Sequence, residues 1–177
     1  AEEARAPEVR PVRTVTVSKR EAGSTVTLTG RIEAQDEAAL GFRIAGRVME
    51  RPVNVGDRVQ PGQTIARLEP QNEMNALRSA QANLAATQAK LTQTRNHFER
   101  QETLLAQGWT TRALFDEAQK ARDTAQAQVD SAEAQLKSAH DLVSFTELKA
   151  DAPGVVTATG AEAGEVVQAG QMIIKLA

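Results

Sequence analysis

The side chains that could hold a metal ion are few and far apart in this sequence. The two histidines, His97 and His140, lie in long helical runs on opposite sides of a turn. Helical rise alone separates them by about 30 Å, so they cannot share a metal ion. The methionines Met49, Met74 and Met172 are scattered, which does not favour a copper or silver site. We therefore expect no metal centre.

The sequence gives equally little support for covalent or acid–base catalysis. There is no cysteine, and no nucleophile stands beside a base or in a phosphate-binding loop. The 23 acidic and 21 basic residues give a net charge of −2, and aromatic residues make up 3% of the chain, so nucleic acid is not an expected partner. The sequence indicates a protein that is not an enzyme and carries no cofactor.

The clearest pattern is a short unit that occurs twice. The segment "GDRVQPGQTIARL" runs from Gly56 to Leu68, and "GEVVQAGQMIIKL" runs from Gly164 to Leu176. The two copies agree in turn glycines and apolar strand positions at one constant offset, so no gap is needed to align them. Each copy is too small to bury a face alone, so the repeat predicts two halves of one pseudo-symmetric β-sandwich. The matched pairs are Gly46/Gly154, Val48/Val156, Gly56/Gly164, Val59/Val167, Gly62/Gly170, Gln63/Gln171, Ile65/Ile173 and Leu68/Leu176.

Glycines at fixed places in the repeated unit indicate tight turns. Gly46, Gly56 and Gly62 are spaced for chain reversals, and Pro61-Gly62 suits a type II turn with positive φ at the glycine. Four glycines are therefore interpreted as backbone requirements rather than ligand contacts: Gly56, Gly62, Gly164 and Gly170.

Residues 70–145, between the two copies, have the composition of long helices. Pro70 suits the first helical position, and no glycine follows it before Gln107. Apolar residues recur every seven positions in two runs separated only by "AQGWTT" (Ala106 to Thr111), which predicts an antiparallel, left-handed coiled coil about 50–55 Å long. The repeating positions are Leu77, Leu84, Leu91, Phe98 and Leu105, then Phe115, Arg122, Val129, Leu136 and Val143, with Ala118, Ala125, Ala132 and Ala139 beside the second run.

The beginning of the chain carries weaker signals. Residues 1–8 are polar and charged, and we expect them to be disordered. Alternating apolar residues between Val9 and Thr29 predict two short strands around a turn at 21–24, followed by extended chain to Ala39. The chain starts without Met, so we expect a processed or trimmed protein. With the sandwich and the helical hairpin, these strands predict an α+β fold.

The order of these segments is similar to that of a known family. The stretch "GFRIAGRVMERPVNVGDRVQPGQTIARLEP" (Gly41 to Pro70) precedes an Ala/Gln-rich hairpin, and "FTELKADAPGVVTATGAEAGEVVQAGQMI" (Phe145 to Ile173) follows it. In this order the chain resembles the periplasmic adaptor proteins, or membrane fusion proteins, of tripartite efflux pumps.

The resemblance implies a division of the chain. Residues 40–69 and 146–177 would be the halves of a split lipoyl-like domain, interrupted by the α-helical hairpin at 70–145. Residues 9–39 would be incoming strands of a β-barrel and membrane-proximal region. The family normally continues past the second half to complete that region, so a chain that ends at Ala177 suggests a truncated form.

The hairpin turn matches a further feature of the family. Adaptors of the resistance-nodulation-division (RND) type often carry Arg, then Leu four residues on, then Ser seven further on; here these positions hold Arg100, Leu104 and Thr111. The resemblance implies that this set docks onto an outer-membrane channel, and Trp109, which lies in the turn, is a further candidate for contact with that partner. Two other roles stay open, because Thr111 suits an N-cap of the second helix and Trp109 could plug the end of the coiled coil.

A carrier role is not indicated. In ordinary lipoyl and biotinyl domains a modified lysine lies on the turn between the two halves. Here the hairpin replaces that turn, and Lys149 lies on the strand-like approach to the second half.

The resemblance implies a periplasmic adaptor, anchored at the inner membrane, that bridges an inner-membrane RND transporter to an outer-membrane channel in multidrug efflux. It also implies self-association into a ring, with the hairpins forming a tube. Two alternatives remain: an adaptor of an ATP-driven (ABC-type) exporter, and a coiled-coil interaction protein such as a chaperone, which would not require the duplicated β unit. The sequence does not identify the pump, the channel or the cargo.

Overall fold

The computed structural model describes residues 8, 10–18, 26–30 and 36–177, and it divides into two units, residues 1–33 and 34–177. Residues 10–18 and 26–30 of the first unit contain no strand, so the two strands predicted before Thr29 are wrong over these residues. Their apolar side chains are exposed, Val12 by 82%. Alternation alone does not make a strand, because a strand pair without further packing is only marginally stable. The turn predicted at 21–24 and the disorder predicted for residues 1–7 lie outside the described residues.

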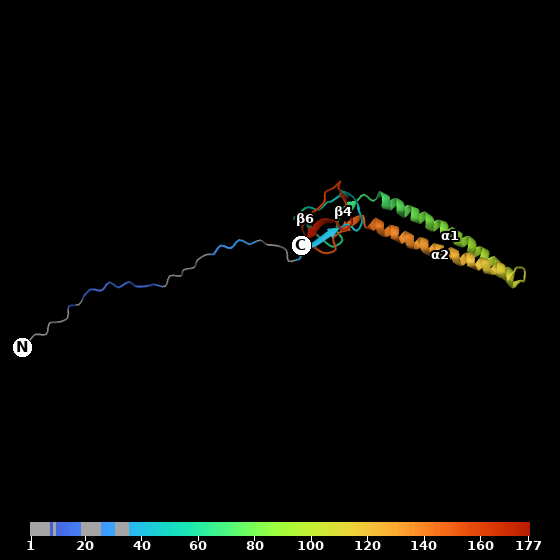
Figure 1. Cartoon of the computed structure of the whole chain (residues 1–177), viewed down its shortest axis with the longest axis horizontal. Helices are drawn as coiled ribbons and strands as arrows, with labels where there is room; N and C mark the ends of the chain where they lie inside the picture. The colour runs from blue at the N-terminus through green and yellow to red at the C-terminus, as the bar shows by residue number, and fades with distance from the viewer. Residues whose placement is uncertain (1–7, 9, 19–25, 31–35) are drawn as a thin grey trace, which may run out of the picture. The chain divides into compact units, whose positions relative to one another are not determined.

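Within residues 36–177 the strands form two antiparallel four-stranded sheets (Figure 1). One sheet has the order β1-β8-β6-β3, and the other has the order β5-β4-β2-β7. We call these two sheets the β module. The strands are β1 (Ala38–Gly41), β2 (Gly46–Glu50), β3 (Arg58–Val59), β4 (Thr64–Leu68), β5 (Glu147–Lys149), β6 (Gly154–Thr159), β7 (Val166–Val167) and β8 (Met172–Leu176).

The β module begins earlier than the sequence indicated. Strand β1 starts at Ala38 and pairs with β8, Ala38 lying opposite Leu176 and Ala39 opposite Lys175. Residues 38 and 39 therefore belong to the module and not to a separate incoming segment. Pairing with the last strand of the chain decides this boundary, and local propensity carries no signal for it.

The two sheets are related by the same offset that relates the two copies in the sequence. Replacing β1, β2, β3 and β4 by β5, β6, β7 and β8, and the reverse, converts the strand order of one sheet into that of the other. Hydrogen bonds between the halves repeat in the same way: Gly62 N donates to Ala150 O, and Gly170 N donates to Phe42 O, both at 2.8 Å. The predicted pseudo-twofold sandwich is confirmed, and each half supplies strands to both sheets.

The turns of the two halves are built alike. Gly62 and Gly170 have φ values of +83° and +78°, in the left-handed region that favours glycine. In each turn a glutamine side chain accepts a backbone hydrogen bond, Gln60 N to Gln63 Oε1 at 3.1 Å and Gln168 N to Gln171 Oε1 at 2.9 Å. This bond explains why glutamine recurs in the repeat.

One glycine has another role than the sequence suggested. Gly46 lies inside β2 and not in a reversal. A β-carbon at this position would come within 3.1 Å of Leu68 Cδ1. The residue is therefore small because the core side chain of the neighbouring strand packs over it.

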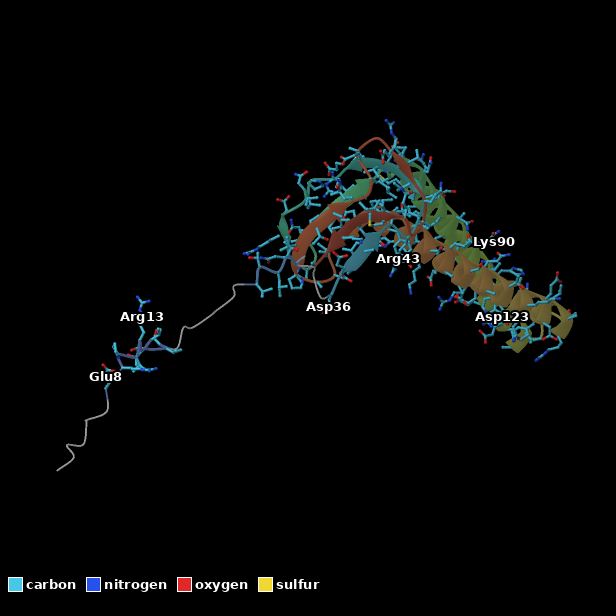
Figure 2. All side chains as sticks on the ribbon, turned by 60° about the vertical axis from the view of Figure 1, so that its left-hand side comes forward. Glu8, Arg13, Asp36, Arg43, Lys90 and Asp123 are labelled. Atoms are coloured by element: carbon cyan, nitrogen blue, oxygen red, sulfur yellow. The ribbon has the colours of Figure 1, made fainter. Side chains whose placement is uncertain are left out.

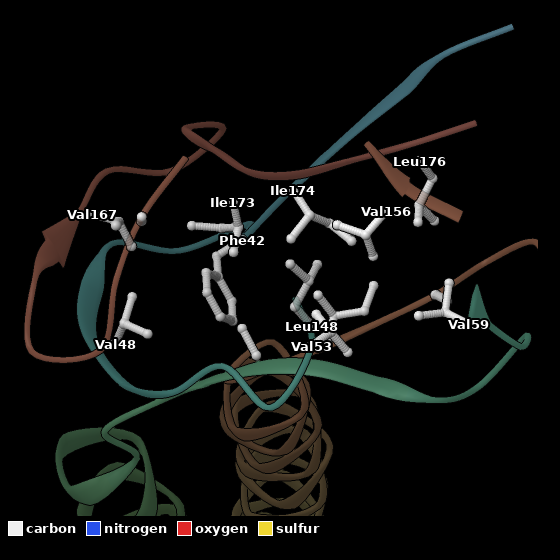
Figure 3. Packing of buried hydrophobic residues seen from close by; sticks show 14 of the residues in the cluster. Phe42, Val48, Val53, Val59, Leu148, Val156, Val167, Ile173, Ile174 and Leu176 are labelled. Carbon is white, nitrogen blue, oxygen red and sulfur yellow. The ribbon is translucent and has the colours of Figure 1, made fainter. Parts of the chain in front are cut away.

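The core of the β module is shared by both halves (Figure 3). Ile65 and Ile173, which are related by the repeat, are both fully buried. Phe42 belongs to the same buried cluster as Val48, Ile173 and Ile174. Neither half could close this core alone, which accounts for the need to bring the two copies together.

Two long helices occupy the interval between the halves. Helix α1 (Gln71–Ala106) and helix α2 (Arg112–Ser144) have 36 and 33 residues, so each extends for about 50–54 Å. They lie side by side and antiparallel (Figure 1), and we call them, with their connecting turn, the hairpin. Pro70 is the N-cap of α1, one residue before the helical position predicted for it. Among the described residues no helix is both long and apolar enough to span a membrane.

The seam between the helices follows the predicted seven-residue period. Ala118, Ala125, Ala132 and Ala139 are all buried, and the leucines of α1 are half-buried. Across the seam, Asn83 Nδ2 donates to Gln135 Oε1 at 3.2 Å. This register places Leu84 at about the level of Ala132, as predicted. Charged side chains such as Lys90 and Asp123 lie along the outside of the hairpin (Figure 2).

The base of the hairpin is joined firmly to the β module. Leu68 N donates to Thr146 O at 2.8 Å, so the last residue of β4 is bonded to the residue that precedes β5. Thr146 is buried, and its hydroxyl donates to Val143 O at 2.7 Å. The guanidinium of Arg43 lies 5.1 Å from the centre of the Phe145 ring. The hairpin therefore projects from a fixed base.

Candidate functional site: the tip of the hairpin

The turn between the helices is defined by backbone hydrogen bonds at the end of α1. Trp109 N donates to Leu104 O at 2.9 Å, and Gly108 N donates to Leu105 O at 3.0 Å. Gly108 has a φ of +74°. Together these features form a Schellman motif, which satisfies the last carbonyl groups of the helix and reverses the chain. The sequence "AQGWTT" thus folds as a tight, bonded turn and not as a loose loop.

The beginning of α2 is fixed by two threonines. Thr111 is the N-cap, and its hydroxyl accepts a hydrogen bond from Leu114 N at 3.3 Å. The capping interpretation of Thr111 is confirmed. Thr110 donates from its hydroxyl to Gln101 Oε1 at 2.8 Å, which ties the turn back to α1. The side chain of Thr111 remains exposed, so its cap bond leaves one face of the residue accessible.

Arg100 and Leu104 lie together on the outer side of α1. With Asn96, Glu99 and Thr103 they line one shallow hollow. Arg100 is exposed and Leu104 is half-buried. Thr111 is not part of the lining, so the structure brings together two of the three residues of the predicted docking set and leaves the third at the start of the next helix.

Trp109 lies on the surface of the tip. Its side chain is 77% exposed, so the interpretation of Trp109 as a plug for the coiled coil is wrong. The distal seam is instead filled by Phe98 and Phe115, whose ring centres are 5.2 Å apart with the planes inclined at 44°. These two rings already occupy the end of the seam, and the indole of Trp109 lies in solvent.

A second exposed apolar side chain was missed by the sequence reasoning. Leu114 is 49% exposed in the first turn of α2. It directly precedes Phe115 of the seven-residue repeat and therefore falls outside the apolar stripe. The sequence did contain a signal for this exposure, because Leu114 is an apolar residue near a helix end that lies beside the apolar stripe and not on it. Leu114 thus joins Trp109 and Leu104 as a large apolar side chain with accessible surface near the turn.

The electrostatics of the tip are those of solvated ion pairs. Arg112 Nε lies 3.1 Å from Asp116 Oδ1, and Arg95 Nε lies 3.4 Å from Glu99 Oε1, each pair one helical turn apart on the surface. Such pairs contribute little to stability. They partner part of the charge around the apolar residues of the tip.

A denser charge group lies on the β module. Arg67 bridges two carboxylates, Glu50 Oε1 at 2.6 Å and Glu147 Oε1 at 3.3 Å. The hydrogen bond from Lys149, and then the charges of Lys149 and Arg67, lower the pKa of Glu147. The hydrogen bond with Glu50 raises the pKa of Arg67. These residues belong to neighbouring strands β2, β4 and β5, so the group connects strands across one sheet.

The other residues considered from the sequence lie apart. Lys149 is in β5, opposite Thr64 of β4, and its Nζ is 3.0 Å from Glu147 Oε2. His97 and His140 are exposed on different helices, and the described residues contain no group of three side chains suited to a metal ion. Met49 and Met74 are exposed, whereas Met172 is half-buried in β8.

Residues 76–146 match the family profile described as the RND membrane fusion protein, α-helical hairpin domain. A UPF0194 membrane protein of Yersinia enterocolitica is 37% identical over 73 residues, which are 41% of this chain and 22% of that protein. The pyoverdine export membrane fusion protein PvdR of Pseudomonas putida is 29% identical over 108 residues, covering 57% of this chain and 28% of the relative. The matches therefore span less than a third of the length of these relatives.

The solved structures agree on the fold. The crystal structure of MacA from Actinobacillus actinomycetemcomitans aligns with a TM-score of 0.68 at 23% identity, covering 78% of this chain and 48% of MacA. The periplasmic adaptor protein EmrA aligns with a TM-score of 0.59 at 18% identity, covering 81% of this chain and 72% of EmrA. Residues 76–146 are thus similar to the α-helical hairpin domain of the membrane fusion proteins, the chain shares its fold with these structures, and its resemblance to the periplasmic adaptor family is confirmed.

Proposed function

We propose that this chain is the adaptor of a tripartite efflux assembly, which bridges an inner-membrane RND transporter to an outer-membrane channel through the tip of the hairpin. The observation that carries the proposal is the match of residues 76–146 to the RND hairpin domain. The relative named for pyoverdine export supports a role in export. The same match favours an RND transporter over the alternative of an ATP-driven exporter.

The geometry suits a mechanical role. A hairpin about 50 Å long projects from a base that is hydrogen-bonded to the β module, so a displacement of the module would be carried to the tip. The tip presents Leu104, Trp109 and Leu114 as apolar contacts and Arg100 as a charge. No chemical step is part of this role, and we propose that the protein is not an enzyme.

A single tip offers only a small contact surface. We propose that the β modules associate side by side in a ring, so that several tips engage one channel together. Repetition of a weak contact raises the overall affinity without any new contact in each copy. The site of action would be the periplasm, with the complete protein held at the inner membrane. The relatives named as membrane proteins support that location.

The docking role is tested with a charge placed at the tip. Leu104→Asp in the full-length protein should abolish efflux in cells, because a carboxylate would have to be desolvated in the contact with the channel. Circular dichroism of the purified variant should show unchanged helicity, since Leu104 is only half-buried near the end of the rod.

Leu142→Asp is the matched control. Leu142 is a partly exposed leucine of α2 at the other end of the hairpin, so the same charge should leave efflux intact there. Normal efflux with Leu104→Asp at normal expression would refute docking through the tip. Loss of both efflux and helicity would indicate that Leu104 acts only in packing.

A further inference from the structure

Four side chains near the tip form a stack that crosses from one helix to the other. The Cζ atom of Arg112 lies 5.2 Å from the ring centre of Phe115, and that ring lies 5.2 Å from the ring of Phe98. The Cζ atom of Arg122 lies 4.3 Å from the ring centre of Phe98. We call Arg112, Phe115, Phe98 and Arg122 the aromatic ladder.

Arg122 holds an unusual place in the sequence pattern. It occupies a repeating seam position of α2 at which the preceding and following positions carry Phe115 and Val129. Its side chain is 33% exposed, and its guanidinium donates through Nε and Nη2 to Asp123 Oδ1 at 2.9 and 2.6 Å. An arginine at a seam position loses the packing that an apolar side chain would make there. Its contact with the Phe98 ring and its hydrogen bonds to Asp123 compensate for that loss.

The ladder differs from the rest of the seam in the kind of constraint it supplies. Nearer the base, leucines of α1 lie at the levels of alanines such as Ala125 and Ala132, and aliphatic contacts of this kind have no preferred mutual orientation. Stacked rings and cations have preferred mutual orientations. The ladder therefore restricts the rotation of α1 against α2 at the distal end.

The ladder is also connected to the residues of the tip. Arg112 is the first residue of α2 and directly follows the cap residue Thr111. Phe98 lies on α1 between the base and Leu104, whose carbonyl accepts the hydrogen bond from Trp109 N. A rotation of either helix at the ladder would move Thr111 and Trp109 relative to each other.

We infer that the aromatic ladder is a positioning device that holds the tip in one orientation, so that the surface made by Leu104 and Trp109 keeps a fixed position relative to Thr111 at the start of α2. The importance of that surface rests on the proposed docking function, but its orientation can be measured in the isolated protein.

Trp109 is the only tryptophan of the chain and lies in the turn, so its fluorescence reports on the tip alone. Phe98→Leu removes the central ring, and Arg122→Leu removes one cation while continuing the apolar repeat. In both variants the fast component of the time-resolved anisotropy of Trp109 should rise about twofold, while circular dichroism stays unchanged. Phe98→Tyr keeps the ring and should behave as the parent protein.

Phe145→Leu is the matched control, because it removes a ring that also lies under an arginine but at the base of the hairpin. It should leave the anisotropy of Trp109 unchanged. Unchanged anisotropy in both Phe98→Leu and Arg122→Leu would overturn the inference, and so would an equal rise in Phe145→Leu.

The two proposals can fail separately. Leu104→Asp should remove efflux without changing the anisotropy of Trp109. If Phe98→Leu and Arg122→Leu raise the anisotropy component and leave efflux intact, the ladder orients the tip but efflux does not depend on that orientation, and the docking function is then decided by Leu104→Asp alone. If they lower efflux with no change in anisotropy, the positioning role is refuted and the docking function stands.

Discussion

The β module and the hairpin bury their apolar side chains in different ways. In the module, Ile65 and Ile173 are enclosed on all sides by residues of both sheets. In the hairpin, Leu84 and Leu91 remain half-buried, because a second helix covers only one side of each. The module therefore depends on one shared core, whereas the hairpin depends on a series of layers that each contribute a small amount. A substitution in the core should therefore destabilise the whole module, whereas a substitution in the hairpin should destabilise mainly the neighbouring helical turns.

The two halves of the module share one backbone plan but differ in their side chains, both on the outer faces and in the core. Glu50, Arg67 and Glu147 form a charged group on one sheet. The constant offset of the repeat assigns Ala158, Lys175 and Ala39 to the corresponding positions of the other sheet. The backbone keeps the symmetry, but the size of the core side chains does not: Phe42 and Ile174 correspond to Ala150 and Ala66, so residues of unequal size fill the shared interior.

The largest effect is expected in the module. Ile173→Ala should lower the free energy of unfolding of the module by about 2–5 kcal/mol, since it leaves a cavity in a closed core. Leu84→Ala in the hairpin should cost less than half as much, because Leu84 is already partly in contact with water. Hydrogen exchange with mass spectrometry of strand and helix peptides measures the two separately. Equal losses would contradict the distinction between a shared core and separate layers.

An intermediate effect is expected from overpacking the seam. Ala125→Leu should destabilise the hairpin by about 1–3 kcal/mol, because Ala125 is 3% exposed and a larger side chain would force the helices apart. Ala121→Leu adds the same side chain on the exposed face of α2 and should be nearly neutral. Thermal unfolding followed by circular dichroism compares the two. Similar melting temperatures would count against a closely packed seam.

The smallest effect is expected at the tip. Thr111→Ala removes the N-cap bond to Leu114 N and should destabilise the first turn of α2 by about 0.5–1 kcal/mol. Thr111→Ser keeps the hydroxyl and should restore protection of the first-turn amides in hydrogen exchange. If serine protects no better than alanine, the hydroxyl is not the source of the cap.

Sequence periodicity was sufficient for the features that depend on local or repeated constraints. The constant offset between the two copies identified both halves of the sandwich, because matching cores and turns require matching residues. The seven-residue repeat identified the hairpin, and Pro61-Gly62 predicted the positive φ found at Gly62. In each case the residues of a short segment are enough to specify its local structure, because burial of one face or a tight turn requires the same residue types wherever it occurs.

Tertiary structure alone decided the features that depend on distant partners. The alternation before Thr29 did not form strands over the described residues, whereas the short run at Ala38 became β1 because β8 pairs with it. Trp109 lies in solvent, although its apolar side chain suggested a plug, and Phe98 and Phe115 fill the end of the seam instead. The stack of Arg122 on Phe98 joins residues of two helices, and their sequence positions become neighbours only once the chain has folded back on itself.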